Sequence, residues 1–215
     1  MIIAGVDEVG VGCLAGPVVA SCVILPEQIN EIFKDSKSTS ESLRSKQFQF
    51  LRRNTYASIG LCTPQEIDEM NILNATHLAM KRAINNIQIK PEKILIDGKY
   101  VPRGLINAEA FIGGDKLHQQ ISAASIYAKY FRDNLMAQYA KIFPMYYFEK
   151  NKGYPTQVHK KAIIEFLPMQ KGDVKETFAD TSSLEDWISY KPRTSIEEGV
   201  QKFVDWYKDF YNIKL

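Results

Sequence analysis

The chain has few cysteines and histidines and no long apolar segment. Its 215 residues include 3 cysteines and 3 histidines. Cys13, Cys22 and Cys62 show neither a metal-binding spacing nor the even number of a disulfide framework, and the histidines lack the spacing of a zinc site. The longest apolar stretches stop well short of the ~20 residues that span a bilayer, and the N-terminus does not resemble a signal peptide. We therefore expect a protein of the reducing cytoplasm that does not contact a membrane.

The chain also lacks a strong charge of either sign, since its net charge is +2. The charge is nevertheless unevenly distributed along the sequence. Residues 1–167 carry 20 Lys and Arg against 16 Asp and Glu, whereas residues 168–215 carry 7 against 9. A mildly basic first part is a weak indication of a polyanionic partner. The asymmetry also indicates that the two parts differ in origin.

Apolar segments with strand and helix periods alternate over most of the chain. Strands are predicted at residues 1–7, 17–25, 56–62, 93–98 and 108–114, and helices at 40–54, 72–87 and 117–135. Beyond residue 168 the sequence is polar until a helix predicted over 194–213, where Thr194 and Glu197 form a capping box. Strands that alternate with helices predict an α/β layer architecture, here followed by a short helical C-terminal tail.

Four carboxylates lie where these apolar segments end. Asp7 and Glu8 end the first predicted strand, Asp97 ends the fourth, and Asp115 stands between a strand and the long helix. In an α/β sheet such strand ends meet at one edge, where ligands bind. Carboxylates brought together there repel one another unless cations lie between them, and Mg²⁺ or Mn²⁺ suits an all-oxygen site. Two such ions about 4 Å apart can align an attacking water and a leaving oxygen at a phosphodiester.

Each of these carboxylates also has a purely structural interpretation. Asp7 and Glu8 fit solvated strand ends. Asp97 fits the first residue of an Asp-Gly turn, and Asp115 fits the N-cap of its helix. For each residue alone this interpretation carries more weight. The structural interpretation becomes weaker when the four carboxylates are considered together, because three of the four positions directly follow an apolar strand.

Seven segments follow one another in the order and spacing of a known enzyme family. They are GVDEVGVGCLAGPVVASCVIL at 5–25, DSK at 35–37, NILNATHLAMKRAI at 71–84, LIDG at 95–98, GD at 114–115, ISAASIYAKYFRD at 121–133 and KGYPTQVH at 152–159. Over about residues 1–166 they resemble ribonuclease HII, the type 2 ribonuclease H. The resemblance implies a ribonuclease H-like mixed sheet flanked by helices, with a catalytic domain over residues 1–167.

The resemblance implies a metal-dependent endonuclease of DNA replication and repair. Such an enzyme cuts the RNA strand of RNA–DNA hybrids, or cuts at ribonucleotides embedded in duplex DNA, and leaves 5′-phosphate ends. The family's catalytic, metal-binding acids fall on Asp7, Glu8, Asp97 and Asp115. These residues would hold Mg²⁺ or Mn²⁺, with two ions present during catalysis. We expect the enzyme to act as a monomer in the cytoplasm.

The resemblance also implies substrate contacts. The family's Gly-Arg-Gly segment, whose backbone reads the 2′-hydroxyl, falls on Gly10, Val11 and Gly12, and the tyrosine of its Lys-Gly-Tyr motif falls on Tyr154. Further candidates for phosphate or backbone contacts, for which solvated or helix-packing roles fit about equally well, are Lys37, Ser122, Ser125 and Lys152.

The sequence departs from the family pattern in two ways. Val11 replaces an arginine and Gly113 replaces a lysine, which removes two positive charges that would bind phosphate. Residues 168–212 resemble the C-terminal end of nucleotide-sugar epimerases of the UDP-glucuronate 4-epimerase type, but the dinucleotide motif and the catalytic Tyr-x-x-x-Lys pair are missing. We therefore expect residues 168–215 to be an epimerase-like fragment and not an independent domain. The alternatives to an active nuclease are a catalytically impaired hybrid-binding protein and a nonfunctional gene-fusion product.

Overall fold

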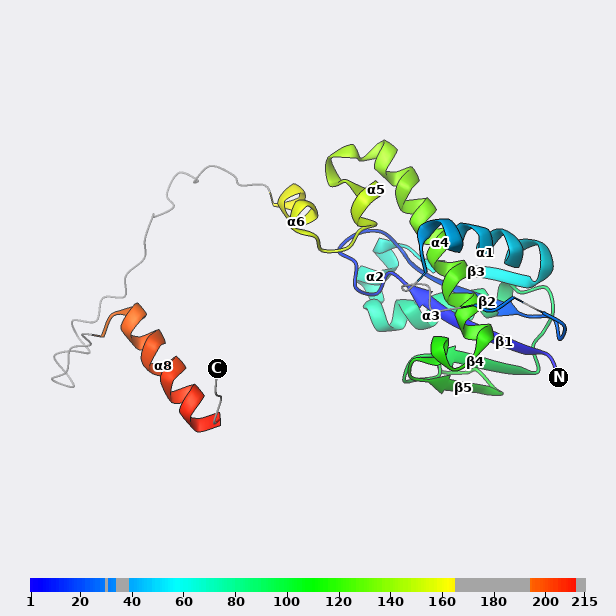
Figure 1. Ribbon diagram of the computed structural model, residues 1–215, viewed down its shortest axis with the longest axis horizontal. Helices are drawn as coiled ribbons and strands as arrows, with labels where there is room; N and C mark the ends of the chain where they lie inside the picture. The colour runs from blue at the N-terminus through cyan, green and yellow to red at the C-terminus, as the bar shows by residue number, and fades with distance from the viewer. Residues whose placement is uncertain (30, 34–38, 165–193, 212–215) are drawn as a thin grey trace. The chain divides into compact units, whose positions relative to one another are not determined.

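The computed structural model describes residues 1–29, 31–33, 39–164 and 194–211, and the chain divides into two compact units, Met1–Phe166 and Leu167–Leu215. The first unit contains one sheet in the order β3-β2-β1-β4-β5 (Figure 1). Its strands are β1 (Ile3–Val9), β2 (Val18–Ile24), β3 (Tyr56–Cys62), β4 (Lys93–Asp97) and β5 (Ala108–Phe111). β2 runs antiparallel to β1 and β3, whereas β1 with β4 and β4 with β5 pair in parallel. This mixed sheet confirms the predicted α/β architecture.

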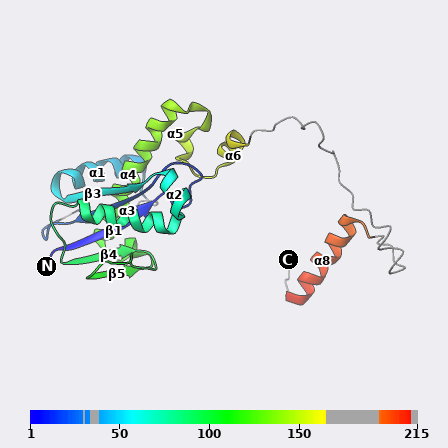
Figure 2. The ribbon, with the colours of Figure 1, turned by 180° about the vertical axis from the view of Figure 1, so that it is seen from behind.

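Helices cover both faces of the sheet. α3 (Ile72–Asn86) packs on one face against β1, β2 and β3, and Figure 2 shows it lying along the sheet. α4 (Gln119–Ile142) packs on the opposite face against β1 and β2, with α1 (Glu41–Asn54) beside it. Successive side chains of a strand point to opposite faces. In β2, Cys22 accordingly belongs to the core under α3 and Val23 to the core under α4.

The backbone of α4 passes very close to β1 because Gly5 lacks a side chain. A Cβ atom at Gly5 would lie 2.1 Å from the carbonyl carbon of Gln120, much nearer than any real side chain approaches a backbone. The close approach brings the following turns of α4 against the second half of β1. In this position the Ser125 side chain forms a hydrogen bond with the Asp7 carboxylate.

Short elements connect the strands and extend the end of α4. α2 (Pro64–Met70) begins with a capping box, in which the Thr63 side chain and Glu66 each bond the other's backbone. Glu66 also forms an ion pair with Arg82 of α3, with 2.7 Å between Oε1 and Nη2. The hydrogen bonds from Arg82 and from the Thr63 backbone lower the pKa of Glu66 to about 2. The remaining short elements are η1 (Gly114–Lys116), η2 (Pro144–Tyr146), α5 (Phe148–Asn151) and α6 (Gln157–Ile163).

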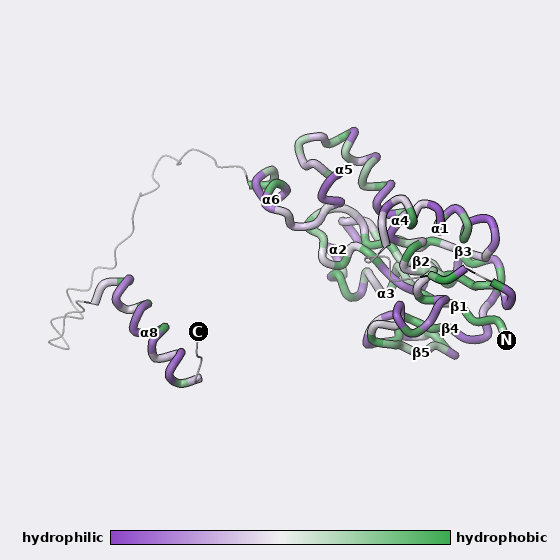
Figure 3. Tube along the Cα trace, viewed as in Figure 1, coloured by the Kyte–Doolittle hydropathy of each residue, from purple (hydrophilic) through white to green (hydrophobic). Residues whose placement is uncertain are grey.

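The described part of the second unit is one amphipathic helix, α8 (Ile196–Tyr211), on which Figure 3 shows apolar and polar residues alternating around the helix. The helix lies within the range predicted for it, but its cap differs. Ser195, and not Thr194, accepts a hydrogen bond from the backbone nitrogen of Glu198 at 3.2 Å. Its large apolar side chains are exposed, among them Val200, Phe203, Trp206 and Phe210. In the part of the chain that the structure describes, no helix is both long enough and apolar enough to cross a membrane.

Candidate active site

Asp7 lies within β1 and is almost completely buried, with 5% of its surface exposed. One carboxylate oxygen, Oδ1, accepts a hydrogen bond from the backbone nitrogen of Glu8 at 2.7 Å. Burial raises the pKa of Asp7 well above its usual value, and the charges of Glu8 and Asp97 raise it further, whereas the hydrogen bond with Ser125 lowers it. A nearby cation would favour the charged form of such a carboxylate.

Asp97 and Asp115 belong to one connected turn at the ends of β4 and β5. Asp97 is the last residue of β4, and its Oδ1 accepts a hydrogen bond from the backbone nitrogen of Gly114 at 2.7 Å. Asp115 follows directly, within η1. The N-cap of α4 is His118, which makes no capping hydrogen bond. The interpretation of Asp115 as the cap of the long helix is therefore wrong.

The four carboxylates share one small cavity at this edge of the sheet. Its volume is about 80 Å³. The residues that line it are Asp7, Glu8, Val9, Asp97, Asp115, Ser125, Lys129 and Tyr154. The ends of β1 and β4 thus converge as the sequence suggests, and α4 and the turn before α6 close the cavity from the other side. The structure brings together the four acids with two of the predicted substrate contacts, Ser125 and Tyr154.

The donor chemistry of the cavity suits a hard divalent cation. Four carboxylates supply oxygen ligands of the kind that Mg²⁺ and Mn²⁺ prefer. The raised pKa of Asp7 records the cost of burying these charges next to one another. Within the described ranges, no three His, Cys, Asp or Glu side chains form a group that could hold a metal ion. The four carboxylates of the cavity therefore fit such an ion by the chemistry of their side chains.

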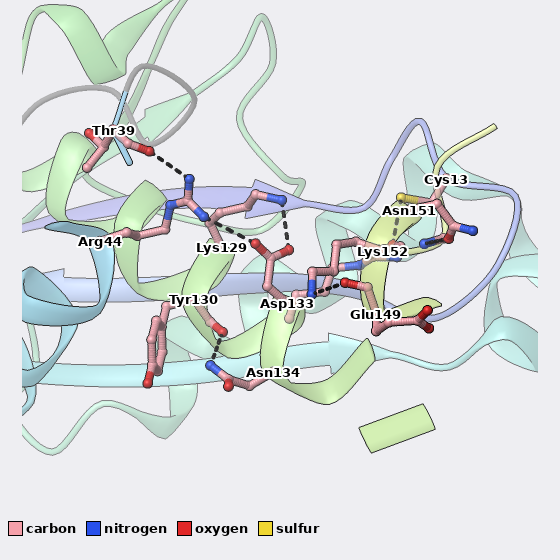
Figure 4. A network of polar contacts seen from close by, with 12 residues as sticks. Cys13, Thr39, Arg44, Lys129, Tyr130, Asp133, Asn134, Glu149, Asn151 and Lys152 are labelled. Atoms are coloured by element: carbon pink, nitrogen blue, oxygen red, sulfur yellow. Dashed lines mark hydrogen bonds and ion pairs between the residues drawn. The ribbon is translucent and has the colours of Figure 1, made fainter. Parts of the chain in front are cut away.

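Lys129 of α4 also lines the cavity, and sequence reasoning did not predict it. Its Nζ atom lies 2.7 Å from Oδ1 of Asp133 and 5.5 Å from the ring centroid of Tyr154. Oδ2 of Asp133 lies 3.2 Å from Nη1 of Arg44, and Nη2 of Arg44 donates to the carbonyl oxygen of Thr39 at 2.8 Å (Figure 4). The ion network therefore holds the Lys129 ammonium at the cavity wall and connects it to α1.

Arg132, also unpredicted, joins two loops beside the cavity and is completely buried. Nε donates to the carbonyl oxygen of Pro17 at 2.8 Å, and Nη2 donates to that of Ala15 at 3.1 Å. Nη1 donates to the carbonyl oxygen of Lys152 at 2.7 Å. One guanidinium thus connects the loop after β1 to the turn that carries Tyr154.

Glycines make room for this guanidinium. Gly10 has φ of +108°, and a Cβ there would lie 2.6 Å from Nε of Arg132. Gly153 has φ of +88°, and a Cβ there would lie 2.3 Å from the carbonyl oxygen of Ala15. At Gly12, by contrast, an added Cβ meets nothing within 4 Å. Gly10 and Gly153 therefore permit the two loops to meet, whereas the backbone at Gly12 is open to a ligand.

Tyr154 presents its ring to two cations at the edge of the cavity. The ring centroid lies 5.5 Å from Nζ of Lys129 and 5.9 Å from Cζ of Arg132. Burial raises the pKa of the Tyr154 hydroxyl above its usual value, so the hydroxyl stays protonated and can donate a hydrogen bond. Nδ1 of the buried His159 lies 2.9 Å from the Tyr154 carbonyl oxygen, which fixes the turn.

The other predicted contacts do not line the cavity. Ser122 is buried and its hydroxyl donates to the carbonyl oxygen of Asp115, so that it supports the turn carrying this acid. The Lys152 ammonium donates to the carbonyl oxygen of Glu149 at 2.8 Å. Lys37 lies outside the described residues.

Comparison with known proteins decides the family. The sequence model described as Ribonuclease HII matches residues 4–181 of the chain. The chain belongs to the ribonuclease HII family. The ribonuclease HII of Acinetobacter baylyi is 48% identical over 164 residues, which cover 75% of this chain and 87% of that protein. The chain is therefore an endoribonuclease of the ribonuclease H type, and ribonuclease HII enzymes depend on divalent metal ions.

Solved structures agree with this assignment. The ribonuclease H2 of Pyrococcus horikoshii OT3 superimposes with a TM-score of 0.62 at 30% identity, over 75% of this chain and 84% of that chain. Bst-RNase HIII in complex with Mn²⁺ gives a TM-score of 0.61 at 17% identity, over 75% of this chain and 60% of that chain, and shows likeness of fold alone. The mixed sheet is thus the ribonuclease H-like sheet that the sequence predicted.

The family match extends beyond the predicted catalytic domain. It ends at residue 181, whereas the sequence pattern ends the domain at 167. Residues 165–193 lie outside the described part of the structure. The resemblance of residues 168–212 to epimerases stays a prediction.

Proposed function

We propose that this ribonuclease HII family member cuts the RNA strand of RNA–DNA hybrids, or cuts at ribonucleotides embedded in duplex DNA, and leaves 5′-phosphate ends. The observation that carries the proposal is the single cavity lined by all four acids together with Tyr154. An acidic cavity repels a phosphodiester unless cations are present, so the carboxylates and the substrate are compatible only in a metal-dependent reaction.

The proposed roles follow from the placement of the residues. Asp7, Glu8, Asp97 and Asp115 would hold Mg²⁺ or Mn²⁺, two ions during catalysis, and such ions activate water and stabilise charge at a phosphodiester. Tyr154 is protonated and would bond and pack against the ribose.

The ribose would be read chiefly by backbone. Gly12 is open to a ligand, so the main chain of Gly10, Val11 and Gly12 would contact the 2′-hydroxyl, the group that distinguishes RNA from DNA. Ser125, at the cavity wall, is a candidate phosphate contact. Lys37 and Lys152 remain candidates of this kind. Ser122, which is buried and bonded to the carbonyl oxygen of Asp115, would act through the backbone of that acid instead of contacting phosphate.

A cleavage assay tests this function. We expect the full chain, with Mg²⁺ or Mn²⁺, to cut a DNA duplex that contains one ribonucleotide and to leave the matched all-DNA duplex intact. A hybrid with a long RNA strand, assayed in parallel, measures the preference between the two substrates. Binding of both ribonucleotide-containing duplexes without cleavage in either metal would instead support the impaired hybrid-binding protein.

Val11→Arg is expected to strengthen binding of the substrate. Val11 is 43% exposed in the loop after β1, so an arginine there can reach solvent and phosphate. One additional phosphate contact should steepen the slope of log affinity against log salt by about 0.9. Fluorescence anisotropy in EDTA over a salt series measures this slope. The control is Ile106→Arg, which adds the same charge at a residue that is 80% exposed and outside the site. If both variants shift the slope equally, position 11 does not face phosphate.

We propose that residues 168–215 are not an independent domain and do not contribute to catalysis. In support, the first unit, Met1–Phe166, contains the complete sheet and all the cavity-lining residues. A chain that ends at Phe166 is therefore expected to cleave a ribonucleotide-containing duplex within a few-fold of the rate of the full chain. Initial rates at matched protein concentrations measure this effect, and loss of cleavage or of cooperative unfolding would contradict it. The epimerase-like origin of residues 168–212 belongs to the same proposal.

We also propose that the enzyme acts as a monomer in the cytoplasm. Cys13, Cys22 and Cys62 are free thiols, which is the state favoured in a reducing compartment. Light scattering on the purified chain would measure the oligomeric state, and a stable dimer would contradict the first part of the proposal.

A further inference from the structure

A second, larger hollow lies between α3 and the segment that follows β4; we call it the basic groove. Its volume is about 680 Å³. Its lining residues, from these two segments, are Leu73, Asn74, His77, Leu78, Lys81, Tyr100, Val101 and Arg103. None of them belongs to the acidic cavity, so the basic groove is a separate surface feature.

The side chains that line the groove include basic groups but no acidic group. Lys81 and Arg103 are cationic, and no carboxylate lines the groove. In the described part of the chain neither residue forms an ion pair, unlike the neighbouring Arg82, which pairs with Glu66. The groove therefore holds two positive charges without local compensation.

Neighbouring groups add one further cation and several hydrogen-bonding groups to the groove. Burial, together with the charge of Lys81, lowers the pKa of His77, so this ring adds hydrogen-bonding capacity but no positive charge. The Lys99 ammonium lies 5.2 Å from the ring centroid of Tyr100, which is 57% exposed. The Tyr100 hydroxyl and the Asn74 amide are donors of the kind that contact phosphate oxygens. Uncompensated cations among such donors form a surface complementary to a polyanion.

One wall of the basic groove follows the acid Asp97 closely along the chain. Its second wall begins at Tyr100, three residues after Asp97, and extends to Arg103. An extended chain spans at most about 3.6 Å per residue, so these two residues lie within about 11 Å and 22 Å of Asp97 along the backbone. A duplex places one phosphate per strand about every 3.4 Å along its axis. The groove is therefore within about six base pairs of a linkage held at Asp97.

We propose that the basic groove binds the phosphodiester backbone of one arm of the substrate duplex, on one side of the linkage that is cut. This inference rests on the proposed function, and it adds a second contact that the acidic cavity cannot supply. Lys81 and Arg103 each contact a phosphate, while Tyr100 and Asn74 donate hydrogen bonds to the same strand. The groove thereby supplies affinity for phosphate that the uncharged Val11 cannot supply.

The test removes the two cations without altering the cavity. K81Q/R103Q is compared with the unaltered chain and with K46Q/R53Q, which removes one lysine and one arginine from α1. Binding to a ribonucleotide-containing duplex is measured in EDTA over a salt series. Each lost phosphate contact lowers the salt slope by about one, so K81Q/R103Q should lower it by about two and K46Q/R53Q should change it much less.

Steady-state cleavage in Mg²⁺ then locates the contact. Two duplexes of equal length carry the ribonucleotide near one end or near the other, so that only one of them extends across the groove. K81Q/R103Q should raise KM for that duplex several-fold and leave kcat unchanged. A salt slope equal to that of K46Q/R53Q, or an equal rise of KM on both duplexes, would overturn the inference while the proposed function stands. Failure of the unaltered chain to cut either duplex would overturn the proposed function itself.

Discussion

Replacing Asp97 with Asn is expected to lower cleavage more than about a hundredfold while the chain stays folded. A neutral amide is a poor ligand for a hard cation. Changes to residues that only support metal ligands already cost about 10- to 100-fold, so loss of a ligand should cost more. The fold is preserved because the amide oxygen of Asn can still accept the hydrogen bond that Oδ1 of Asp97 accepts from Gly114.

Turnover at saturating Mg²⁺, together with circular dichroism, measures this prediction. The control is Glu109→Gln, the same acid-to-amide change at an exposed residue of β5 that pairs with Lys93. The control should cleave normally. Unchanged turnover in Asp97→Asn would remove this carboxylate from the mechanism and would leave the acidic cavity without its proposed role.

Replacing Arg132 with Met is expected to destabilise the fold and to impair the site together. The three buried nitrogens of Arg132 each donate to a backbone carbonyl, and Met offers no donor to Pro17, Ala15 or Lys152. Hydrogen bonds from charged groups contribute roughly 1.5–3 kcal/mol each, so the free energy of unfolding should fall by about 3 kcal/mol or more. The loop after β1 and the Tyr154 turn would then lose their connection.

Urea unfolding measures the stability, and cleavage measured well below the unfolding midpoint isolates the effect on the site. Arg82→Met is the matched control, because Arg82 also bonds a backbone carbonyl and an acid but has a side chain that is 39% exposed. Arg132 is a positioning residue, so KM for a ribonucleotide-containing duplex should rise in Arg132→Met even where the protein is folded. If stability and KM match those of the control, Arg132 does not organise the site.

The sheet was predictable because its strands are apolar runs with clear ends. The alternation of strands with helices predicted the layers. The placement of acids near strand ends predicted the cavity, although β1 continues two residues beyond Asp7, to Val9, and only Asp97 is the last residue of its strand. The predicted start of the long helix was less accurate. The helix was expected to begin at residue 117, but Leu117 precedes it and is 66% exposed. The cause is local: Gly113 adopts a left-handed conformation and η1 intervenes, so α4 begins only at Gln119.

The two cationic residues of the site escaped prediction for different reasons. Lys129 follows Ser125 by four residues, which places both on one face of α4, so helical spacing could have indicated it. Arg132 gave no such signal, since arginine is almost never fully buried unless it is paired. Its partners are the backbone carbonyl oxygens of Ala15, Pro17 and Lys152, which are distant from it in sequence. Because every residue type has a backbone carbonyl, the sequence does not indicate such partners.

Direct measurement of cation binding tests the central claim that the four carboxylates form one divalent-metal site. Free Mn²⁺ is measured by electron paramagnetic resonance during titration into the full chain, in the absence of nucleic acid. The account predicts saturable Mn²⁺ binding by the unaltered chain, with an affinity at least about tenfold weaker in Asp97→Asn and unchanged in Glu109→Gln. Equal Mn²⁺ binding by all three proteins would contradict the account.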